Sequence, residues 1–257
     1  MSEQFGPWEL TALIAVGGLG EVWRSRRAEG REAAVKRLHT HLRNHPEAMR
    51  QFAIEQQLST ELPRHPNLVH GVESGDVAGR PYLATELAEG VDLRRRQAPE
   101  PDTTGLDLVA AACDAVSHLH VHGWIHGDVN PSNLVIGPGD HPVLVDLGNA
   151  RRVDDATDRT VRGTHAYMAP EQARGERWTT ATDVFALGVI AWELSARRRL
   201  FKRDAPWLSV AAVIEEPAPP LADARLRPIV DAALAKDPAR RTQTAAELAE
   251  QLRALVA

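Results

Sequence analysis

The stretch Ile125-His126-Gly127-Asp128-Val129-Asn130-Pro131-Ser132-Asn133 decides the fold of this chain. The apolar run 134–136 directly after it is typical of a short buried strand, and Val143–Leu147 has the same pattern with Asp146 near its end. We therefore expect a small hairpin that carries two acids and an amide on its adjoining loops.

These polar side chains differ in the chemistry that they offer. Asn133 and Asp146 present hard oxygen ligands, which Mg²⁺ prefers in sites where it also binds phosphates. Asp128 precedes Asn133 by five residues and remains available to accept a proton. The stretch therefore combines two candidate metal ligands with a candidate general base.

The composition is ordinary for a soluble globular protein, because 43% of the 257 residues are hydrophobic and 25% are charged. This length allows one large domain or two small lobes with a cleft between them. The net charge of −5 argues against a nucleic-acid-binding surface. The single cysteine excludes an intrachain disulfide, residues 1–4 show no secretory signal, and no apolar run approaches a membrane span. We therefore expect a cytoplasmic chain that binds neither nucleic acid nor membrane.

A glycine-rich hairpin is predicted near the start of the chain. The run 9–16 is typical of a strand, Gly17-Gly18-Leu19-Gly20 turns the chain, and 21–26 returns as a second strand. Small residues in such a turn let backbone amides approach phosphate oxygens. A plain turn without a ligand would show the same glycines.

Lys36 ends a short apolar segment, where its ammonium either extends to water or contacts phosphates. The second interpretation requires a carboxylate that holds the lysine. A helix predicted over 46–62 carries Glu55 beside its apolar face. Glu47 and Glu61 on the same helix are alternative partners for Lys36.

A second long helix is predicted over 104–122, where apolar residues recur mostly at three- and four-residue steps. It carries three histidines, and a fourth follows it, so the region suggests a metal site at His118, His120, His122 and His126. Alternate positions on a helix point in different directions, and no set of cysteines or carboxylates completes a zinc shell. We therefore do not expect zinc here.

Two more motifs follow, Gly163-Thr164-His165-Ala166-Tyr167-Met168-Ala169-Pro170-Glu171 and Asp237-Pro238-Ala239-Arg240-Arg241. With the glycine-rich hairpin and the opening stretch, they resemble in order and spacing the motifs of eukaryotic-type (Hanks-type) serine/threonine protein kinases, as a bacterial-like stand-alone kinase domain. The resemblance covers about residues 8–255 and implies an α+β, bilobal protein-kinase fold. A small antiparallel β-sheet lobe with one main helix would span about 8–86, and a larger, mostly helical lobe about 89–255.

The resemblance implies transfer of the γ-phosphoryl group of ATP to Ser or Thr of a protein substrate, including autophosphorylation. Asp128 would accept or orient the hydroxyl proton. Lys36, held by Glu55, would position the α- and β-phosphates. Thr164 would hydrogen-bond Asp128, and Asn130 would donate a hydrogen bond to the γ-phosphate.

The resemblance also implies how ATP is bound, with Asn133 and Asp146 as the ligands of Mg²⁺ (or Mn²⁺) and with the backbone of Glu86 and Ala88 pairing with adenine. Ordinary core packing would explain the side chains placed around the ring equally well. The implied nucleotide-binding residues are Ala15, Val16, Gly17, Gly18, Gly20, Val22, Ala34, Lys36, Thr85, Glu86, Ala88, Asn133, Val135 and Asp146.

Two buried supports of the site are implied as well. Asp183 lies near the start of a very apolar helix, where a carboxylate suits the helix dipole and can cap loop amides. In the family, the residue at this position braces the catalytic loop. Arg241 would form a buried ion pair with Glu171. A final helix over about 245–255, with Leu248, Leu252 and Leu255 on its buried face, would close the fold.

Four positions depart from the family pattern, at Ala15, Gly127, Asn130 and Leu147. The family has Lys where Asn130 stands, and losing a donor to the transition state costs about 10²–10³ in rate. Because Asn still donates a neutral hydrogen bond, we expect a slower enzyme. The family has Arg where Gly127 stands, and this Arg grips a phosphate on the activation segment. Its absence predicts activity that does not depend on phosphorylation of Thr157 or Thr160.

Two other classes of protein remain open. A pseudokinase would bind ATP or a partner without turnover, which Gly127 and Asn130 favour and the intact Lys36 and Asp128 oppose. A small-molecule phosphotransferase of the aminoglycoside kinase type would share His-Gly-Asp followed by Asn, but not the Glu171–Arg241 pair of motifs. The sequence does not indicate the protein substrate, the oligomeric state or the upstream regulator. We expect regulation to come from another chain.

Overall fold

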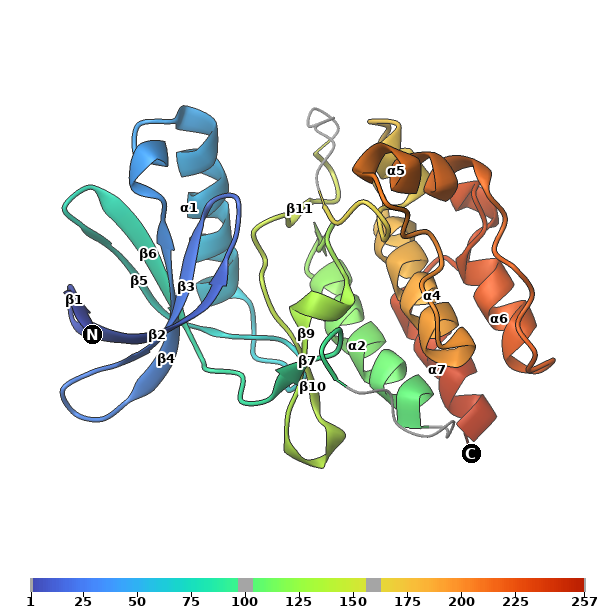
Figure 1. The fold of residues 1–257 in the computed structure, drawn as a ribbon, viewed down its shortest axis with the longest axis horizontal. Helices are drawn as coiled ribbons and strands as arrows, with labels where there is room; N and C mark the ends of the chain where they lie inside the picture. Colours follow the sequence, from blue (N-terminus) through green and yellow to red (C-terminus); the bar gives the residue numbers. More distant parts are fainter. Residues whose placement is uncertain (1, 97–103, 156–162, 257) are drawn as a thin grey trace. The chain divides into compact units, whose positions relative to one another are not determined.

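The computed structural model describes residues 2–96, 104–155 and 163–256 (Figure 1). The chain divides into two compact units, of which the first comprises Met1–Glu89 and Asp146–Gly148 and the second Gly90–Val145 and Asn149–Ala257. The predicted α+β fold class is confirmed, because the first unit is an antiparallel sheet with one main helix and the second is larger and mostly helical.

The first unit is built on an antiparallel sheet with the strand order β1-β2-β3-β4-β6-β5. Alternation along β6 places Tyr82 and Ala84 on one face of the sheet, in a core with Trp8. It places Leu83 on the other face, against Phe52 of α1. The elements of this unit are β1 (Glu3–Phe5), β2 (Trp8–Val16), β3 (Gly20–Arg26), β4 (Glu32–Leu38), α1 (Pro46–Glu61), β5 (Gly71–Val77) and β6 (Arg80–Thr85).

Helix α1 packs against β5 and β6. It starts at Pro46, whose fixed φ suits the first helical position, and it ends before Leu62, which precedes a proline and takes an extended conformation. Its buried residues include Phe52 and Leu58, as the helical spacing predicts. Strand β1 was not predicted from the sequence, and it is anchored to β4 by two hydrogen bonds from Arg37 to Glu3, of 2.6 and 3.0 Å.

The second unit is organised around a helix that is apolar on all sides, α4, in which every residue from Ala181 to Trp192 is buried. Helices α2 and α7 pack against it and against each other. In the final helix Leu248 and Leu252 are buried as predicted. The helices of this unit are α2 (Thr104–Val121), α3 (Pro170–Ala173), α4 (Thr180–Ala196), α5 (Pro206–Glu215), α6 (Leu226–Ala233) and α7 (Ala245–Val256).

The predicted hairpin beside the opening stretch is present. Strand β9 (Leu134–Ile136) pairs antiparallel with β10 (Pro142–Leu144), and β7 (Val91–Asp92) pairs with the other edge of β9. Strands β8 (Trp124–Ile125) and β11 (Arg151–Arg152) form a second small sheet. These strands fix both ends of the loop 126–133. No helix within the described ranges is long and apolar enough to cross a membrane.

Candidate active site

Lys36 is the centre of a charged cluster in the first unit. Its Nζ donates to both carboxylate oxygens of Glu55, at 2.7 and 2.8 Å, and to Oδ1 of Asp146 at 2.7 Å. The predicted contact with Glu55 is therefore present. The two alternative partners, Glu47 and Glu61, are exposed on other faces of α1.

Burial and charge act in opposite directions on this cluster. Burial disfavours the ammonium of Lys36, but the attraction of Asp146 and Glu55 outweighs it and raises the pKa of Lys36. Glu55 is 2% exposed, and its burial raises the pKa of its carboxyl to about 7 against the attraction of Lys36. Lys36 therefore carries its positive charge at neutral pH, as a contact with phosphates requires.

The glycines of the hairpin between β2 and β3 have different reasons to be glycine. A Cβ on Gly20 would lie 2.2 Å from the carbonyl oxygen of Arg37, so close pairing of β3 with β4 requires glycine there. A Cβ on Gly18 would have no neighbour within 4 Å, and the amide of Gly17 closes the turn onto Gly20 O at 2.8 Å. Gly18 therefore leaves open space at the turn, which a phosphate could use. Ala15 and Val16, at the end of β2, are exposed.

The residues predicted around the adenine ring are not part of a fully buried core. Val22 on β3, Ala34 on β4 and Thr85 at the end of β6 are all half-buried, and Ala34 pairs with Thr85 across the sheet. The amide of Glu86 donates to the carbonyl of His70 at 2.9 Å, so its own carbonyl is the group that could pair with a base. In the second unit, Val135, which is also predicted beside the ring, and Asn133, a predicted metal ligand, are half-buried as well.

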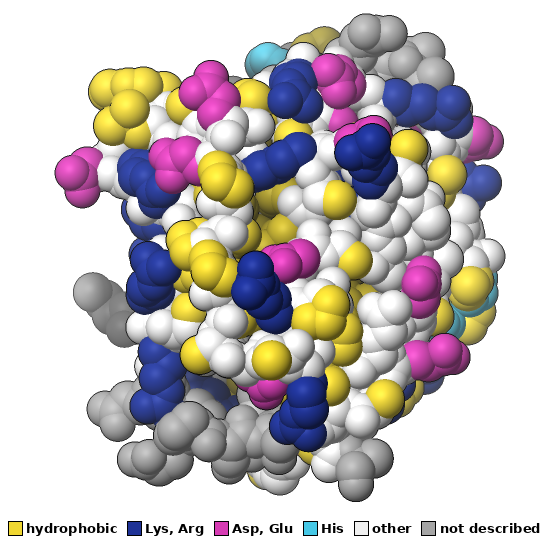
Figure 2. Space-filling model, turned by 90° about the vertical axis from the view of Figure 1, so that its right-hand side faces the viewer, with side chains coloured by type: hydrophobic (Ala, Val, Ile, Leu, Met, Phe, Trp, Pro, Cys, Tyr) yellow, Lys and Arg dark blue, Asp and Glu magenta, His cyan; other side chains and the backbone are white. Residues whose placement is uncertain are grey.

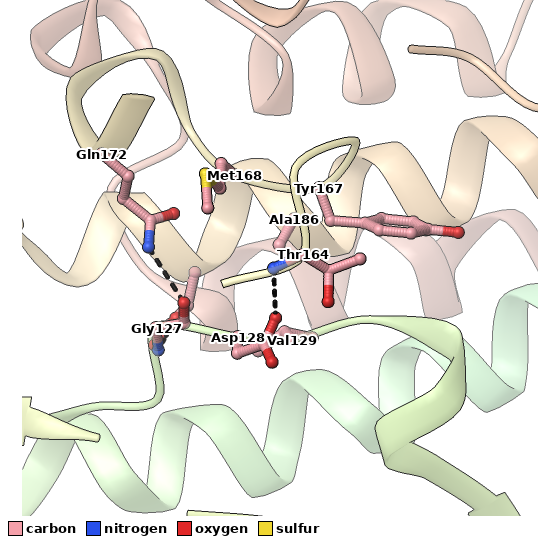
Figure 3. A pocket seen from close by; sticks show the side chains of 9 residues that line it. Gly127, Asp128, Val129, Thr164, Tyr167, Met168, Gln172 and Ala186 are labelled. Carbon is pink, nitrogen blue, oxygen red and sulfur yellow. Dashed lines mark hydrogen bonds between the residues drawn. The ribbon is translucent and has the colours of Figure 1, made fainter. Parts of the chain in front are cut away.

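Asp128 lies on the loop before β9, and both of its carboxylate oxygens accept hydrogen bonds. Oδ1 accepts from the backbone amide of Thr164 at 2.7 Å (Figure 3) and from Nδ2 of Asn130 at 3.1 Å. Oδ2 accepts from Nδ2 of Asn133 at 3.4 Å and of Asn149 at 3.3 Å. The predicted contact between Thr164 and Asp128 is confirmed, and the donor is the backbone amide of Thr164. The contact from Asn149 was not predicted.

Asn130 uses both ends of its amide within the loop. Its Nδ2 donates to the backbone oxygen and to Oδ1 of Asp128, and its Oδ1 accepts from the amide of Ser132 at 2.9 Å. It thereby caps the 3₁₀ turn Pro131–Asn133. The expected hydrogen bond from Asn130 to a γ-phosphate would require this amide to leave Asp128.

Asp183 braces the loop from below, as predicted. Its carboxylate accepts hydrogen bonds from the amides of His126 and Gly127, both at 2.8 Å, and lies 2.8 Å from Nε2 of His120. Burial opposes the charge of Asp183, but the hydrogen bonds from His120 and Gly127, together with the attraction of His120 and His126, outweigh it and lower the pKa of the carboxyl. Of the other histidines, His118 and His122 pack ring to ring, with centroids 4.5 Å apart. No group of three or more possible His, Cys, Asp or Glu ligands occurs among the described residues.

Behind the loop, Gly127, Met168 and Gln172 are among the residues that line a tight space (Figure 3). The side chain of Gln172 donates to the carbonyl of Gly127 at 2.9 Å and accepts from the amide of Ala169 at 2.9 Å. The loop is therefore tied to α3 as well as to α4. The sequence had given no indication of this role for Gln172.

The structure explains why position 127 holds glycine. Gly127 has φ +75°, and a Cβ there would lie 2.5 Å from Cζ3 of Trp178 and 3.0 Å from the carbonyl oxygen of Asn149. The guanidinium of Arg151 lies over the ring of Trp178, 3.2 Å from its centroid. Trp178 and Arg151 are 3% and 7% exposed, so the space that a side chain at 127 would need is filled.

Replacing Gly127 with Arg, the usual family residue, is expected to lower the free energy of unfolding by about 3–5 kcal/mol, because it adds backbone strain to overpacking. Gly139 is the matched control, since it also has positive φ (+68°) but a Cβ there meets nothing within 4 Å. Gly139→Arg should cost about 1–2 kcal/mol for the left-handed backbone alone. Urea denaturation measures both variants, and equal losses would contradict this account of Gly127.

A buried ion pair contacts the start of α4. Arg241, 2% exposed, donates from Nη1 and Nη2 to the two carboxylate oxygens of Glu171, 1% exposed, at 2.7 and 3.0 Å. Thr182 donates to the same carboxylate at 3.0 Å. The ion pair predicted between the two late motifs is therefore confirmed, and it joins α3 to the turn before α7.

A family model described as the protein kinase domain matches residues 8–252. The chain belongs to the protein kinase family. Its relatives include a probable serine/threonine-protein kinase of Corynebacterium efficiens, which is 35% identical over 96% of this chain and 41% of its own length. The serine/threonine-protein kinase PknB of Mycobacterium leprae is 35% identical over 95% of this chain and 42% of its own length. The serine/threonine-protein kinase PknA of Mycobacterium tuberculosis is 32% identical over 97% of this chain and 61% of its own length.

The kinase domain thus spans about two fifths of the length of the first two relatives and three fifths of the third. Family membership agrees with the resemblance drawn from the motifs. Thr157 and Thr160, on whose phosphorylation the activity is predicted not to depend, lie outside the described residues.

Proposed function

We propose that this kinase domain transfers the γ-phosphoryl group of ATP to Ser or Thr hydroxyls of proteins. The observation that carries the proposal is the ion pair of Lys36 with Glu55, because it holds a positive charge where the family binds phosphates. The relatives named above, which are serine/threonine-protein kinases by name, support the choice of Ser and Thr. An inactive scaffold has no comparable observation in its favour.

The residues of each unit fit the groups that the reaction needs. In the first unit, Lys36 would bind the α- and β-phosphates, and the amides around Gly18 would approach them across open space. The carbonyl of Glu86 and the backbone of Ala88 would pair with adenine. Mg²⁺ bound to ATP supplies charge neutralisation at the phosphates.

The metal ligands proposed are Asn133 and Asp146. Because Asn133 gives its Nδ2 to Asp128, its amide oxygen is the end available to a cation. Asp146 offers a carboxylate whose side chain is 44% exposed. Few protein ligands suffice, since Mg²⁺ completes its shell with water and phosphate oxygens.

The chemical step assigned to this chain is the handling of one proton. The substrate hydroxyl oxygen bonds to the γ-phosphorus while the bond from phosphorus to the leaving ADP oxygen breaks, and Asp128 accepts the hydroxyl proton. The amides that surround its carboxylate fix its orientation. Catalysis by the chain is otherwise positioning.

The remaining properties are proposals from composition and surface. On the face shown in Figure 2, Lys and Arg side chains are interspersed with Asp and Glu side chains, and the net charge is −5. This supports a protein substrate in preference to a nucleic acid. We also propose that the domain acts in the cytoplasm without a membrane contact of its own.

Transfer of label from radiolabelled ATP, with Mg²⁺ or Mn²⁺, to the domain itself and to a generic basic protein tests the function. We expect label on Ser or Thr that disappears in Lys36→Ala and on addition of a metal chelator. Lys202→Ala is the control, because Lys202 is an exposed lysine outside the site. An intact, folded wild-type domain that binds ATP without transferring label would overturn the proposal and indicate a pseudokinase.

Replacing both Thr157 and Thr160 with Ala is expected to leave the rate of transfer to the basic protein unchanged within about twofold. The physical reason is that no arginine stands at position 127, and that the guanidinium of Arg151 is stacked on Trp178. Initial rates of the purified double variant check this. A loss of tenfold or more would show that a phosphate on this segment is needed after all.

A further inference from the structure

The carboxylate of Asp128 is oriented by side-chain amides on both of its oxygens. Asn130 donates to Oδ1 and Asn149 donates to Oδ2, at 3.1 and 3.3 Å. A rotation of the carboxylate plane would break both contacts at once. In a proposed general base, such a rotation would turn the proton-accepting lone pair away from the substrate, so these amides matter for the reaction and not only for the fold.

Asn149 reaches Asp128 from a different part of the chain than the loop itself. It follows Gly148 directly and is half-buried. Its backbone oxygen lies 3.0 Å from the position that a Cβ on Gly127 would take, so its main chain packs against the same loop that its side chain contacts. Both the close packing at Gly127 and the amide contact at Asp128 therefore place Asn149 against the loop.

We propose that Asn149 is a positioning residue for Asp128, acting on Oδ2 as Asn130 acts on Oδ1. This inference rests on the proposed kinase function. The amide of Asn149 is neutral, so it orients the carboxylate without the strong stabilisation of the anion that a cation would give, and Asp128 keeps its ability to take a proton.

Three substitutions at position 149 separate orientation from packing. Asn149→Leu keeps the size of the side chain and removes the donor, so kcat should fall about tenfold, the value of one hydrogen bond to a charged group. Asn149→Asp keeps the shape but places a second carboxylate beside Asp128, so kcat should fall further, about 100-fold. Asn149→Ser keeps a donor and should recover part of the loss. The KM for ATP should stay within about twofold in all three variants, because Asn149 contacts Asp128, the proposed general base, and has no proposed contact with ATP.

Comparing Asn149→Leu with Asn149→Asp distinguishes orientation of Asp128 from packing. If Asn149 only packed against the loop, the isosteric Asn149→Asp would be the milder change. Asn44→Leu, at an exposed position of the first unit, controls for the loss of any Asn amide and should keep the wild-type kcat. Equal kcat for wild type and Asn149→Leu, or a smaller loss in Asn149→Asp than in Asn149→Leu, would overturn the positioning role of Asn149. Either result would leave the proposed kinase function intact. A folded wild-type domain without phosphoryl transfer overturns the proposed function and this inference with it.

Discussion

Replacing Asp128 with Asn is expected to lower the rate of phosphoryl transfer by about 10²–10⁴, the usual contribution of a positioned general base. Asn has the shape of Asp but lacks the anionic lone pairs that would take the hydroxyl proton. Thr164 and Asn149 each donate a hydrogen bond to one oxygen of Asp128, so the NH₂ group of an asparagine at 128 would meet one of these donors in place of an acceptor. The affinity for ATP should change little, since the phosphate contacts proposed for Lys36 are untouched.

The measurement is the initial rate of label transfer at saturating ATP, together with ATP affinity by calorimetry. Asp204→Asn serves as the control, because Asp204 is an exposed aspartate of the second unit. If Asp128→Asn retained more than a tenth of the wild-type rate, Asp128 would not be the base. A parallel loss of ATP binding would instead show that the variant had damaged the fold.

Replacing Arg241 with Met is expected to lower the free energy of unfolding by about 3–5 kcal/mol, because it leaves the carboxylate of Glu171 buried without its partner. The arginine also donates to the carbonyl of Ala181 at 2.7 Å and to that of Ala235 at 3.0 Å, and these acceptors would lose their donor. Adding Glu171→Leu to Arg241→Met should restore a large part of the loss, since the double variant no longer buries an unpaired charge.

Urea denaturation of the single and double variants measures these differences. Arg227→Met is the matched control, because Arg227 pairs with Asp231 one helical turn away at half-exposed positions, where an ion pair contributes about 0–1 kcal/mol. A loss below about 1 kcal/mol for Arg241→Met would contradict the structural role of the pair. A double variant no more stable than the single variant would show that the carbonyl contacts, and not the charge, dominate.

Helices α1, α2 and α7 could be predicted because each has a clear periodicity or a terminal signal. The helix predicted over 46–62 is α1, Pro46–Glu61, and the one over 245–255 is α7, Ala245–Val256. The burial predicted for the end of α7 was wrong at Leu255, which is half-buried because it lies in the last turn. Strands β1, β7 and β11 were not predicted, because they lack the continuous apolar run that marks the equally short β9.

The candidate site was predictable where a motif is local in sequence and not where it depends on packing. Asp128, Asn133 and Lys36 were predicted because each lies in a short motif that resembles a motif of the protein kinase family. Asn149 was missed because its contact with Asp128 joins segments 21 residues apart. Trp178 was missed because nothing nearby in the sequence indicates that it fills the space beside Gly127, although a large aromatic residue within a polar run could have suggested burial.

The brace at Asp183 has a consequence for the lifetime of the catalytic loop. Its carboxylate accepts hydrogen bonds from two loop amides, and it lies on a helix in which every residue from Ala181 to Trp192 is buried. Freeing these amides requires the start of α4 to leave the core, so the loop lacks a low-energy opening of its own. The protons on His126 and Gly127 should therefore exchange with solvent only as the whole second unit unfolds, and the base keeps its orientation for as long as that unit stays folded.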